Sequence, residues 1–329
     1  MNWQGKKVLV TGAAGFIGSH LTERLVQFGA NVTAFIRYNS RGSRGSLEML
    51  PKELQSEIKI VMGDLKDPYA VKNAVKGQEI IFHLAALIGI PYSYVHPINY
   101  VQTNVLGTSY LLSACLDENI EKFINTSTSE VYGTAKYVPI DEGHPLQGQS
   151  PYSASKIAAD KMAESFFCAF KLPVAIIRPF NTYGPRQPSR AVIPTIISQA
   201  MKNNKIKLGS LTPTRDLNYV GDTVSGFIRV AEVPESAGEV INIGSSKEIS
   251  VGDLAKKIFM LLGKSPEIIT EERRLRPEKS EVERLLANTD KAKKILNWSP
   301  EITLDEGLKR TIAWTVQNPD FHKVDAYHI

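Results

Sequence analysis

Short apolar runs alternate with amphipathic helical patterns through the first half of this chain, and this alternation limits its fold more than any other feature. The runs expected to form strands are residues 6–11, 31–36, 58–62, 79–84, 122–126 and 174–178. The helical patterns are residues 16–28, 68–75, 98–117 and 151–170. Strands that alternate with helices form βαβ units, which build a parallel sheet covered by helices on both faces. The chain is therefore predicted to be an α/β protein with a doubly wound parallel sheet.

A glycine-rich turn, Thr-Gly-Ala-Ala-Gly-Phe-Ile-Gly at residues 11–18, joins the first strand to the first helix. Glycines let the backbone turn tightly and approach a pyrophosphate, while the N-terminus of the helix offers N–H groups and a positive dipole end. Because the turn lies between a strand and an amphipathic helix, it indicates a Rossmann-like dinucleotide site. The residues expected to bind the dinucleotide here are Gly12, Gly15, Phe16, Ile17 and Gly18.

The second strand ends without the acid that usually holds the ribose 2′-OH of NAD. Arg37 follows the strand instead, with Ser40 and Arg41 in the next loop. A carboxylate would repel a 2′-phosphate, whereas these side chains can bind it. The sequence therefore favours NADP, with NAD as the alternative. Asp64 and Leu65, just past the third strand, are placed to reach the adenine edge, although Asp64 is also suited to cap the next helix.

The alternation loosens after residue 178, where prolines punctuate the chain. Helices are expected at residues 193–202, 251–262, 289–296 and 304–315, and a strand at residues 240–243. This pattern predicts a smaller, mixed α/β lobe at the carboxyl edge of the sheet, where open α/β sheets bind ligands. Residues 1–179, with a return segment near 217–243, are expected to bind the dinucleotide. Residues 180–216 and 244–329 are expected to form the smaller lobe.

Charge and composition limit the partners. The net charge is +5, but the basic residues form short groups, which suit the phosphates of small molecules better than a nucleic-acid duplex.

No apolar stretch approaches the ~20 residues of a membrane-spanning helix. Residues 1–7 run straight into the first strand, which leaves no room for a signal peptide. Cys115 and Cys168 lie in apolar helical patterns and are expected to be buried free thiols in a reducing cytoplasm. No nucleic-acid partner, membrane contact or metal site is predicted.

Tyr152 and Lys156 are one helical turn apart and lie on one helix face. Lys156 can anchor a nicotinamide ribose, and its charge favours the ionised form of Tyr152, which can then act as a base toward a sugar hydroxyl. Thr128, Ser129 and Glu130 leave the carboxyl end of the fifth strand. This cluster offers hydroxyls for the reacting oxygen and a carboxylate; the alternative is a Ser/Thr turn with a solvated glutamate.

Taken together, these motifs resemble the extended short-chain dehydrogenase/reductases that act on nucleotide sugars. The resemblance spans almost the whole chain. It rests on residues 11–18, His83-Leu-Ala-Ala86, Thr103-Asn-Val-Leu-Gly-Thr108, Ser127-Thr-Ser-Glu-Val-Tyr-Gly133, Tyr152-x-x-x-Lys156, Arg178-Pro-Phe-Asn-Thr-Tyr-Gly-Pro-Arg186, Arg215-Asp216 and Arg276-Pro277. It implies that Ala85 contacts the cofactor, and that Thr128 and Tyr152 act on the C4 hydroxyl while its hydride passes to the nicotinamide.

Within this family, Glu130 points to a 4,6-dehydratase, in which it would remove the C5 proton before water leaves from C6 and the hydride returns there. Many such enzymes carry an Asp before the Glu, whereas this chain has Ser129, as the GDP-mannose dehydratase branch does. Either Glu130 both removes the C5 proton and acts as the acid for the departing hydroxyl, or Ser129 relays a proton to that hydroxyl through water. UDP-glucuronate decarboxylases share this motif and are the nearest rivals, with 4-epimerases next. A Rossmann-fold NADP sensor without turnover is a remote alternative, because a sensor needs no Tyr152 or Lys156.

The resemblance also implies a substrate and an assembly. Residues 208–216 look most like those of bacterial 4,6-dehydratases acting on UDP-N-acetylglucosamine. The residues expected to bind the nucleotide sugar are Ser93, Asn104, Asn181, Arg186, Arg215 and Arg276. Apolar residues occupy more than one face of the helices at 98–117 and 151–170, so the chain is expected to form a homodimer through a four-helix contact.

Overall fold

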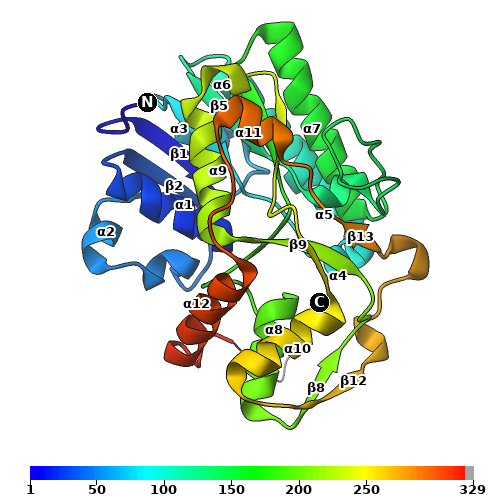
Figure 1. Ribbon diagram of the computed structural model, residues 1–329. Coiled ribbons are helices and arrows are strands. Elements are labelled where there is room, and N and C mark those ends of the chain that lie inside the picture. The colour runs from blue at the N-terminus through cyan, green and yellow to red at the C-terminus, as the bar shows by residue number, and fades with distance from the viewer. Residues whose placement is uncertain (323–329) are drawn as a thin grey trace.

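The computed structural model of the protein describes residues 1–322 (Figure 1). Within this range, seven strands form one sheet in the order β10-β6-β5-β4-β1-β2-β3, and every neighbouring pair is parallel. The strands are β1 (Lys7–Thr11), β2 (Asn31–Arg37), β3 (Lys59–Gly63), β4 (Ile80–His83), β5 (Lys122–Thr126), β6 (Val174–Pro179) and β10 (Val240–Ile243). The predicted parallel sheet is confirmed, and each strand lies within one or two residues of its predicted range.

Helices cover both faces of this sheet. One face carries α1 (Phe16–Gln27), α9 (Val220–Glu232) and α11 (Asp290–Leu296), and the other carries α3 (Pro68–Val75), α6 (Gly107–Cys115) and α7 (Pro151–Phe170). Because successive side chains of a strand point to opposite faces, Val8 and Val10 belong to one core while Leu9 belongs to the other. The sheet is therefore doubly wound, as the sequence predicted.

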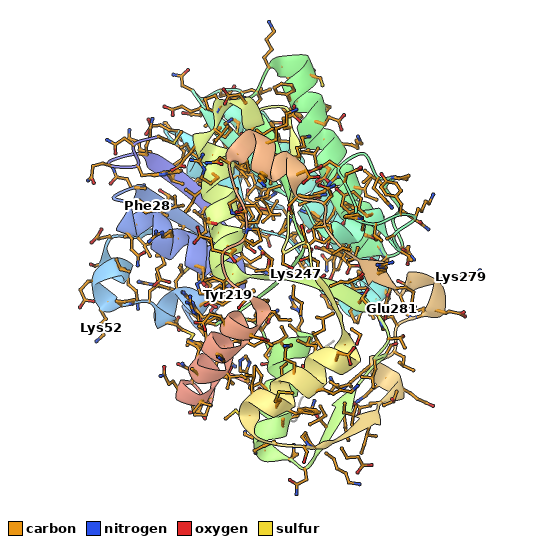
Figure 2. The ribbon with its side chains drawn as sticks, viewed as in Figure 1. Phe28, Lys52, Tyr219, Lys247, Lys279 and Glu281 are labelled. Carbon is orange, nitrogen blue, oxygen red and sulfur yellow. The ribbon has the colours of Figure 1, made fainter. Side chains whose placement is uncertain are left out.

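The second half of the chain builds smaller sheets below the large one in Figure 1. Strand β9 (Thr214–Tyr219) pairs with β7 (Asn181–Tyr183), β11 (Glu248–Ser250) and β13 (Arg284–Leu285), and β8 (Lys205–Leu208) pairs with β12 (Glu267–Thr270). Helices α8 (Val192–Lys202), α10 (Val251–Leu262) and α12 (Leu304–Gln317) share a core with these strands. Tyr219, labelled in Figure 2, packs against this core and against the core of the large sheet.

The structure also contains helices that the sequence pattern did not predict. They are α2 (Lys52–Ser56), α4 (Ile90–Val95) and α9. The predicted helix at residues 98–117 consists of α5 (Pro97–Tyr100), the π-helical turn η2 (Val101–Leu106) and α6. Such π-turns often occur at functional sites. Helix α11, within the range expected for the smaller lobe, packs on β10 of the large sheet.

Cys115 is buried, as expected, but Cys168 is exposed on the outer face of α7, so the prediction for Cys168 was wrong. An apolar helical pattern shows which residues share a face, but it does not show which face the sheet covers. Among residues 1–322, none of the helices combines the length and apolar character required to cross a bilayer.

Candidate active site

The glycine turn lies where the strand order of the large sheet reverses. The chain runs from β1 outward to β2 and β3, then returns to place β4 on the other side of β1. Gly12 has φ +72°, and a Cβ there would lie 2.7 Å from the backbone nitrogen of Ala85. A Cβ on Gly18 would lie 2.2 Å from the carbonyl oxygen of Gly12. Only glycine fits both positions, which leaves bare backbone at the edge where such sheets bind ligands.

Helix α1 supplies the other half of a dinucleotide site. Gly15 is its N-cap and has no side chain to bond the first N–H groups of the helix. Phe16 and Ile17 form its first turn, which has a positive dipole end and carries no acidic residue. The backbone of this turn therefore fits a dinucleotide pyrophosphate.

A chain of hydrogen bonds connects the glycine turn to the strand and helix beside it. The Ala85 N–H donates to Thr11 Oγ1 at 3.1 Å, and Thr11 Oγ1 lies 2.8 Å from His83 Nδ1. His83 Nε2 in turn lies 2.9 Å from Thr108 Oγ1. Burial, together with the charge of Lys156, lowers the pKa of His83 to about 3. A neutral His83 can accept at one nitrogen and donate at the other, so it joins β1 to α6.

The side chains expected at the 2′-phosphate are exposed around the end of β2. Arg37 closes the strand, and Ser40 and Arg41 follow in an open loop. Asp64 Oδ1 accepts from the backbone of Lys66 at 2.9 Å. The cap of α3 is a different residue, Asp67, so the capping role considered for Asp64 is excluded. Leu65 is buried against Gly107, where a Cβ would lie 2.8 Å from the Cβ of Leu65.

The catalytic cluster forms where β5 ends and α7 begins. Thr128 caps the short 3-10 helix η3 (Ser129–Tyr132), and its Oγ1 accepts from the Glu130 N–H at 3.2 Å. Thr128 also hydrogen-bonds Tyr152 of α7, and Glu130 is close enough to raise the pKa of Tyr152 by its charge. Thr128 and Glu130 are partly exposed, whereas Ser129 between them is 2% exposed. The structure thus brings Thr128, Glu130 and Tyr152 together and turns Ser129 inward.

The pKa of Tyr152 is raised, whereas the sequence predicted that the charge of Lys156 would favour the ionised form of this tyrosine. Burial raises the pKa of Tyr152, although the Thr128 hydrogen bond and the charge of Arg190 oppose this rise. The amino group of Lys156 donates to the carbonyl oxygen of Thr126 at 2.5 Å, and burial lowers the pKa of Lys156. Tyr152 is therefore protonated at neutral pH, because the effect of burial on its pKa outweighs the effects of Thr128 and Arg190. No motif in the sequence pointed to Arg190.

Behind Lys156 lies a buried carboxylate that sequence reasoning also missed. Asp160 follows Lys156 by one helical turn and is 1% exposed. It accepts hydrogen bonds from Ser127 at 2.6 Å and from Asn125 at 3.1 Å, and it forms an ion pair with Arg178 at 3.2 Å. These bonds tie β5, β6 and α7 together beside the lysine. An acid four residues after Lys156 on its helix face was the available signal.

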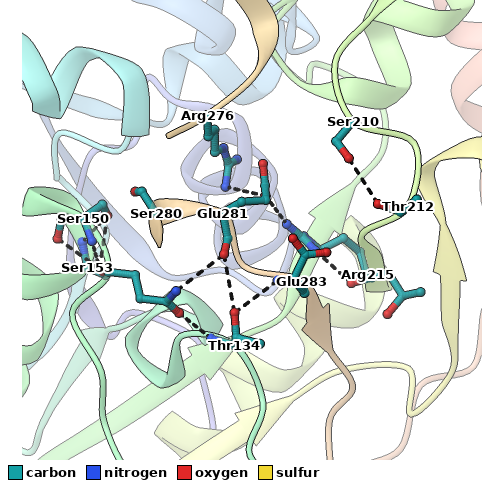
Figure 3. Close-up of polar contacts among 12 residues, drawn as sticks. Thr134, Ser150, Ser153, Ser210, Thr212, Arg215, Arg276, Ser280, Glu281 and Glu283 are labelled. Atoms are coloured by element: carbon teal, nitrogen blue, oxygen red, sulfur yellow. Dashed lines mark hydrogen bonds and ion pairs between the residues drawn. The ribbon is translucent and has the colours of Figure 1, made fainter. Parts of the chain in front are cut away.

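The expected phosphate arginines converge from two directions (Figure 3). Arg215 lies on β9, Arg276 lies between β12 and β13, and Glu281 lies between the two guanidinium groups. Arg215 is also close enough to Glu130 for their charges to interact. Asn181 begins β7, beside β9, and its buried Oδ1 has no hydrogen-bond partner among the described residues. Arg215 and Arg276 thus offer guanidinium donors for an anionic ligand, and Arg215 offers them beside the catalytic cluster.

Three other residues expected to touch the substrate are engaged elsewhere. Ser93 is fully buried and donates to Ile90 at 2.6 Å. Asn104, 1% exposed in the π-turn, uses its Nδ2 for the carbonyl of Leu87 and for Ser155, both at 2.9 Å. Neither side chain has a donor left for a ligand in this arrangement, and a substrate contact by Ser93 or Asn104 stays a prediction. Their motifs did not reveal whether a polar group faces the cleft or the core.

Arg186 is the third of these residues. It is 8% exposed with φ +65°, and it forms an ion pair with Glu23 and a hydrogen bond with His20, both on α1. Its guanidinium contacts the first helix through Nη2, while its buried Nη1 has no hydrogen-bond partner among the described residues. A substrate contact by Arg186 therefore stays a prediction. Arg186 links the segment after β7 to the element that begins with the glycine turn.

This fold and cluster define a class of enzyme: an extended short-chain dehydrogenase/reductase, with a glycine turn at the switch point and a Tyr–Lys pair on one helix. A family model described as GDP-mannose 4,6 dehydratase matches residues 9–311, and the chain belongs to this family of nucleotide-sugar dehydratases and epimerases. The human dTDP-D-glucose 4,6-dehydratase is 35% identical over 324 residues, covering 96% of this chain and 91% of that protein.

Further relatives show the range of reactions in this family. A UDP-N-acetyl-alpha-D-glucosaminuronate decarboxylase of Bacillus cytotoxicus is 33% identical, covering 94% of this chain and 97% of that protein. The crystal structure of the dTDP-glucose 4,6-dehydratase DesIV of Streptomyces venezuelae, with NAD and TYD bound, has a TM-score of 0.86 at 27% identity. It covers 96% of this chain and 98% of that chain. The predicted family, fold class and enzymatic character are thus confirmed, and the individual reaction is not decided by likeness.

Proposed function

We propose that this enzyme is a nucleotide-sugar 4,6-dehydratase. The observation that supports this most directly is the partly exposed Glu130 beside Tyr152 and Arg215. Oxidation at C4 needs one base, and removal of the C5 proton needs a second base aimed at the same sugar ring. Tyr152 and Glu130 supply the two bases from one cluster of side chains. The human dehydratase is the relative whose reaction fits this pair.

The roles of the side chains follow from their placement. Tyr152, held by Thr128, takes the proton of the C4 hydroxyl when it is in its ionised form. When bound, a nicotinamide dinucleotide accepts a hydride from the sugar and later returns it, so the net reaction is loss of water. Glu130 takes the C5 proton, which the C4 ketone has made acidic, and then protonates the C6 hydroxyl as it leaves. Because Ser129 is buried, we assign both steps to Glu130 rather than a relay through Ser129. When the hydride returns to C6, C5 gains a proton, which balances the proton that Tyr152 took from the C4 hydroxyl.

We propose UDP-N-acetylglucosamine as the substrate, bound through its diphosphate by Arg215 and Arg276, with Asn181 at its side. The resemblance of residues 208–216 to enzymes acting on this sugar supports the choice. Incubation with a panel of nucleotide sugars, read by mass spectrometry, tests it. Loss of water from UDP-N-acetylglucosamine is the expected result. An isomer of unchanged mass would show an epimerase, and release of carbon dioxide from UDP-glucuronate would show a decarboxylase. No change with any sugar would favour the NADP sensor.

We also make a proposal about which parts of the chain bind the dinucleotide and which bind the sugar. We propose that residues 1–179 with the return segment near 217–243 bind the dinucleotide. The smaller lobe, residues 180–216 and 244–329, then closes the sugar site; its residues 323–329 lie outside the described range. We also propose that the enzyme works in the cytoplasm, where its free thiols remain reduced.

We propose NADP as the preferred cofactor, although the related DesIV structure holds NAD. The exposed Arg37, Ser40 and Arg41 support this choice, because their donors suit a 2′-phosphate. NADP should therefore bind more tightly than NAD, and Arg37→Asp should reverse the order by charge repulsion. Calorimetric titration of both variants with both dinucleotides measures this. Equal affinities that the substitution leaves unchanged would contradict the proposal.

We propose that the enzyme is a homodimer, joined through the outer faces of η2, α6 and α7. Leu111, Leu112 and Cys115, counted from the sequence as surplus apolar residues, are buried against the sheet. The apolar residues that do remain exposed on these helices and on the adjoining α5 are Ile98, Val101, Leu106 and Phe170. A two-fold axis would bury this surface against its own copy.

Light scattering at micromolar concentration should therefore give the mass of a dimer. The double change Ile98→Glu and Val101→Glu should shift it to the mass of a monomer, because charges in an apolar interface are costly. Met260→Glu is the control, since Met260 is 80% exposed on α10, away from these helices. A monomeric parent protein would disprove the assembly.

A further inference from the structure

The two arginines proposed to bind the diphosphate share one carboxylate oxygen in the free protein. Arg215 Nη2 lies 3.1 Å from Glu281 Oε1, and Arg276 Nη1 lies 3.4 Å from the same atom. Figure 3 shows Glu281 between the two guanidinium groups, which come from separate segments of the chain. A carboxylate thus occupies the position between the arginines that a bridging phosphate oxygen would take.

The carboxylate of Glu281 is important because Arg215 is buried, so water cannot stabilise its charge. Arg215 is 9% exposed, and the side chain of Glu281 is 16% exposed. Burial lowers the pKa of Arg215, and the nearby charge of Arg276 acts in the same direction, while Glu130 and Glu281 oppose both effects. Arg276 is more accessible, with a side chain 27% exposed, but the buried Arg215 guanidinium beside it is stable only next to an anion. In the free protein Glu281 is the anion that contacts both.

The backbone around Glu281 is fixed, so its side chain is the part that can move. The carbonyl of Glu281 accepts from Thr134 Oγ1 at 3.4 Å and from Gln149 Nε2 at 3.5 Å. Gln149 also bonds the carbonyl of Lys279 at 3.1 Å, and Thr134 accepts from the Glu283 N–H at 3.2 Å. In Figure 2 Lys279 lies at the outer edge of the molecule and Glu281 further inward. A change of side-chain rotamer could release the arginines without moving this segment.

We propose that Glu281 is a built-in counter-ion of the diphosphate site, which substrate binding replaces with phosphate oxygens. This inference rests on the proposed function, because it requires Arg215 and Arg276 to bind the diphosphate. Glu281 sets the affinity and the selectivity of the site. Once the carboxylate has left, a ligand must offer a charged oxygen to each arginine, and a diphosphate carries such oxygens on two separate phosphate groups. Diphosphates meet this condition better than monophosphates, so Glu281 selects nucleoside diphosphates over nucleoside monophosphates and hexose phosphates.

Glu281→Gln tests this inference, because it keeps the shape of the side chain and removes the charge that competes with phosphate. UDP should bind this variant more tightly than the parent, by about three- to tenfold in calorimetric titration, as expected for one partly screened ion pair. UMP should gain more than UDP, so the ratio of their affinities should fall. Glu283→Gln is the matched control: it removes the same charge from an exposed side chain two residues away and should change neither affinity.

Thermal unfolding gives a second, independent measurement. Without ligand, Glu281→Gln should have a lower Tm than the parent, because its arginines lack their shared anion. UDP should raise the Tm of the variant more than that of the parent. Equal or weaker UDP binding by the variant would overturn the counter-ion role, as would a variant that UDP cannot stabilise. If the parent itself bound no nucleoside diphosphate, the proposed function would fail as well, which separates the two cases.

Discussion

Glu130→Gln should slow the loss of water from the nucleotide sugar by about 10²–10⁴-fold, the usual cost of removing a positioned general base. Oxidation at C4 should persist, because Thr128 and Tyr152 are unchanged. The backbone N–H of residue 130 can still donate to Thr128 Oγ1, so the strand end keeps its shape. The variant should therefore accumulate the oxidised sugar, seen as near-ultraviolet absorbance of the reduced nicotinamide, and solvent deuterium should no longer enter at C5.

The same change should move the pH dependence of the oxidation step. The negative charge of Glu130 raises the pKa of Tyr152, because it disfavours a second negative charge nearby. Removing that charge lowers the pKa of Tyr152, so more of the phenol is ionised at a given pH. The rise of the oxidation rate with pH should then occur at lower pH in Glu130→Gln than in the parent. Single-turnover rates measured across pH provide this comparison.

Tyr152→Phe is the companion variant, since it should suppress both oxidation and water loss while Glu130 remains in place. The contrast between the two variants separates the two bases. Dehydration by Glu130→Gln at the parental rate would show that Glu130 is not the C5 base. Release of carbon dioxide from UDP-glucuronate by the parent would show that the enzyme is a decarboxylase and not a dehydratase.

The large sheet could be predicted from the sequence because all of its strands except the edge strand β3 are largely buried on both faces. Such strands appear as continuous apolar runs, and residues 80–83 and 122–125 are buried without interruption. The strands of the second half carry no comparable pattern. β11 spans three residues and β13 only two, so each is held by its partner β9 rather than by its own composition. Helix α9 was missed although its apolar residues are periodic, because Gly221 and Gly226 obscure the pattern.

The residues of the candidate active site also divide into those that the sequence could reveal and those that it could not. Gly12, Thr128 and Tyr152 could be found because their chemistry depends on neighbours within a few residues. Asp160 and Glu281 could not be assigned roles, because each acts on groups brought to it by other strands. Sequence reasoning finds polar residues near a site, but it does not show which of their donors the fold has already used.

Asp160→Asn should lower the free energy of unfolding by about 3–5 kcal/mol, the usual effect of removing one partner from a buried ion pair. The ion pair with Arg178 has side-chain exposures of 4% and 2%, so water cannot replace the lost charge. The change would leave Arg178 and Lys156 as buried cations on either side of a neutral amide. Chemical denaturation, followed by circular dichroism, measures the difference.

Two further variants distinguish a lost buried charge from general damage to α7. Lys161→Gln removes the exposed ion pair with Glu164 one residue along the same helix, and should change stability by less than about 0.5 kcal/mol. The double change Asp160→Leu and Arg178→Met removes both buried charges and should recover much of the stability lost in Asp160→Asn. It should not restore turnover, because Lys156 would still lack the carboxylate whose charge raises its pKa. Full activity in the double variant would show that Asp160 serves stability alone.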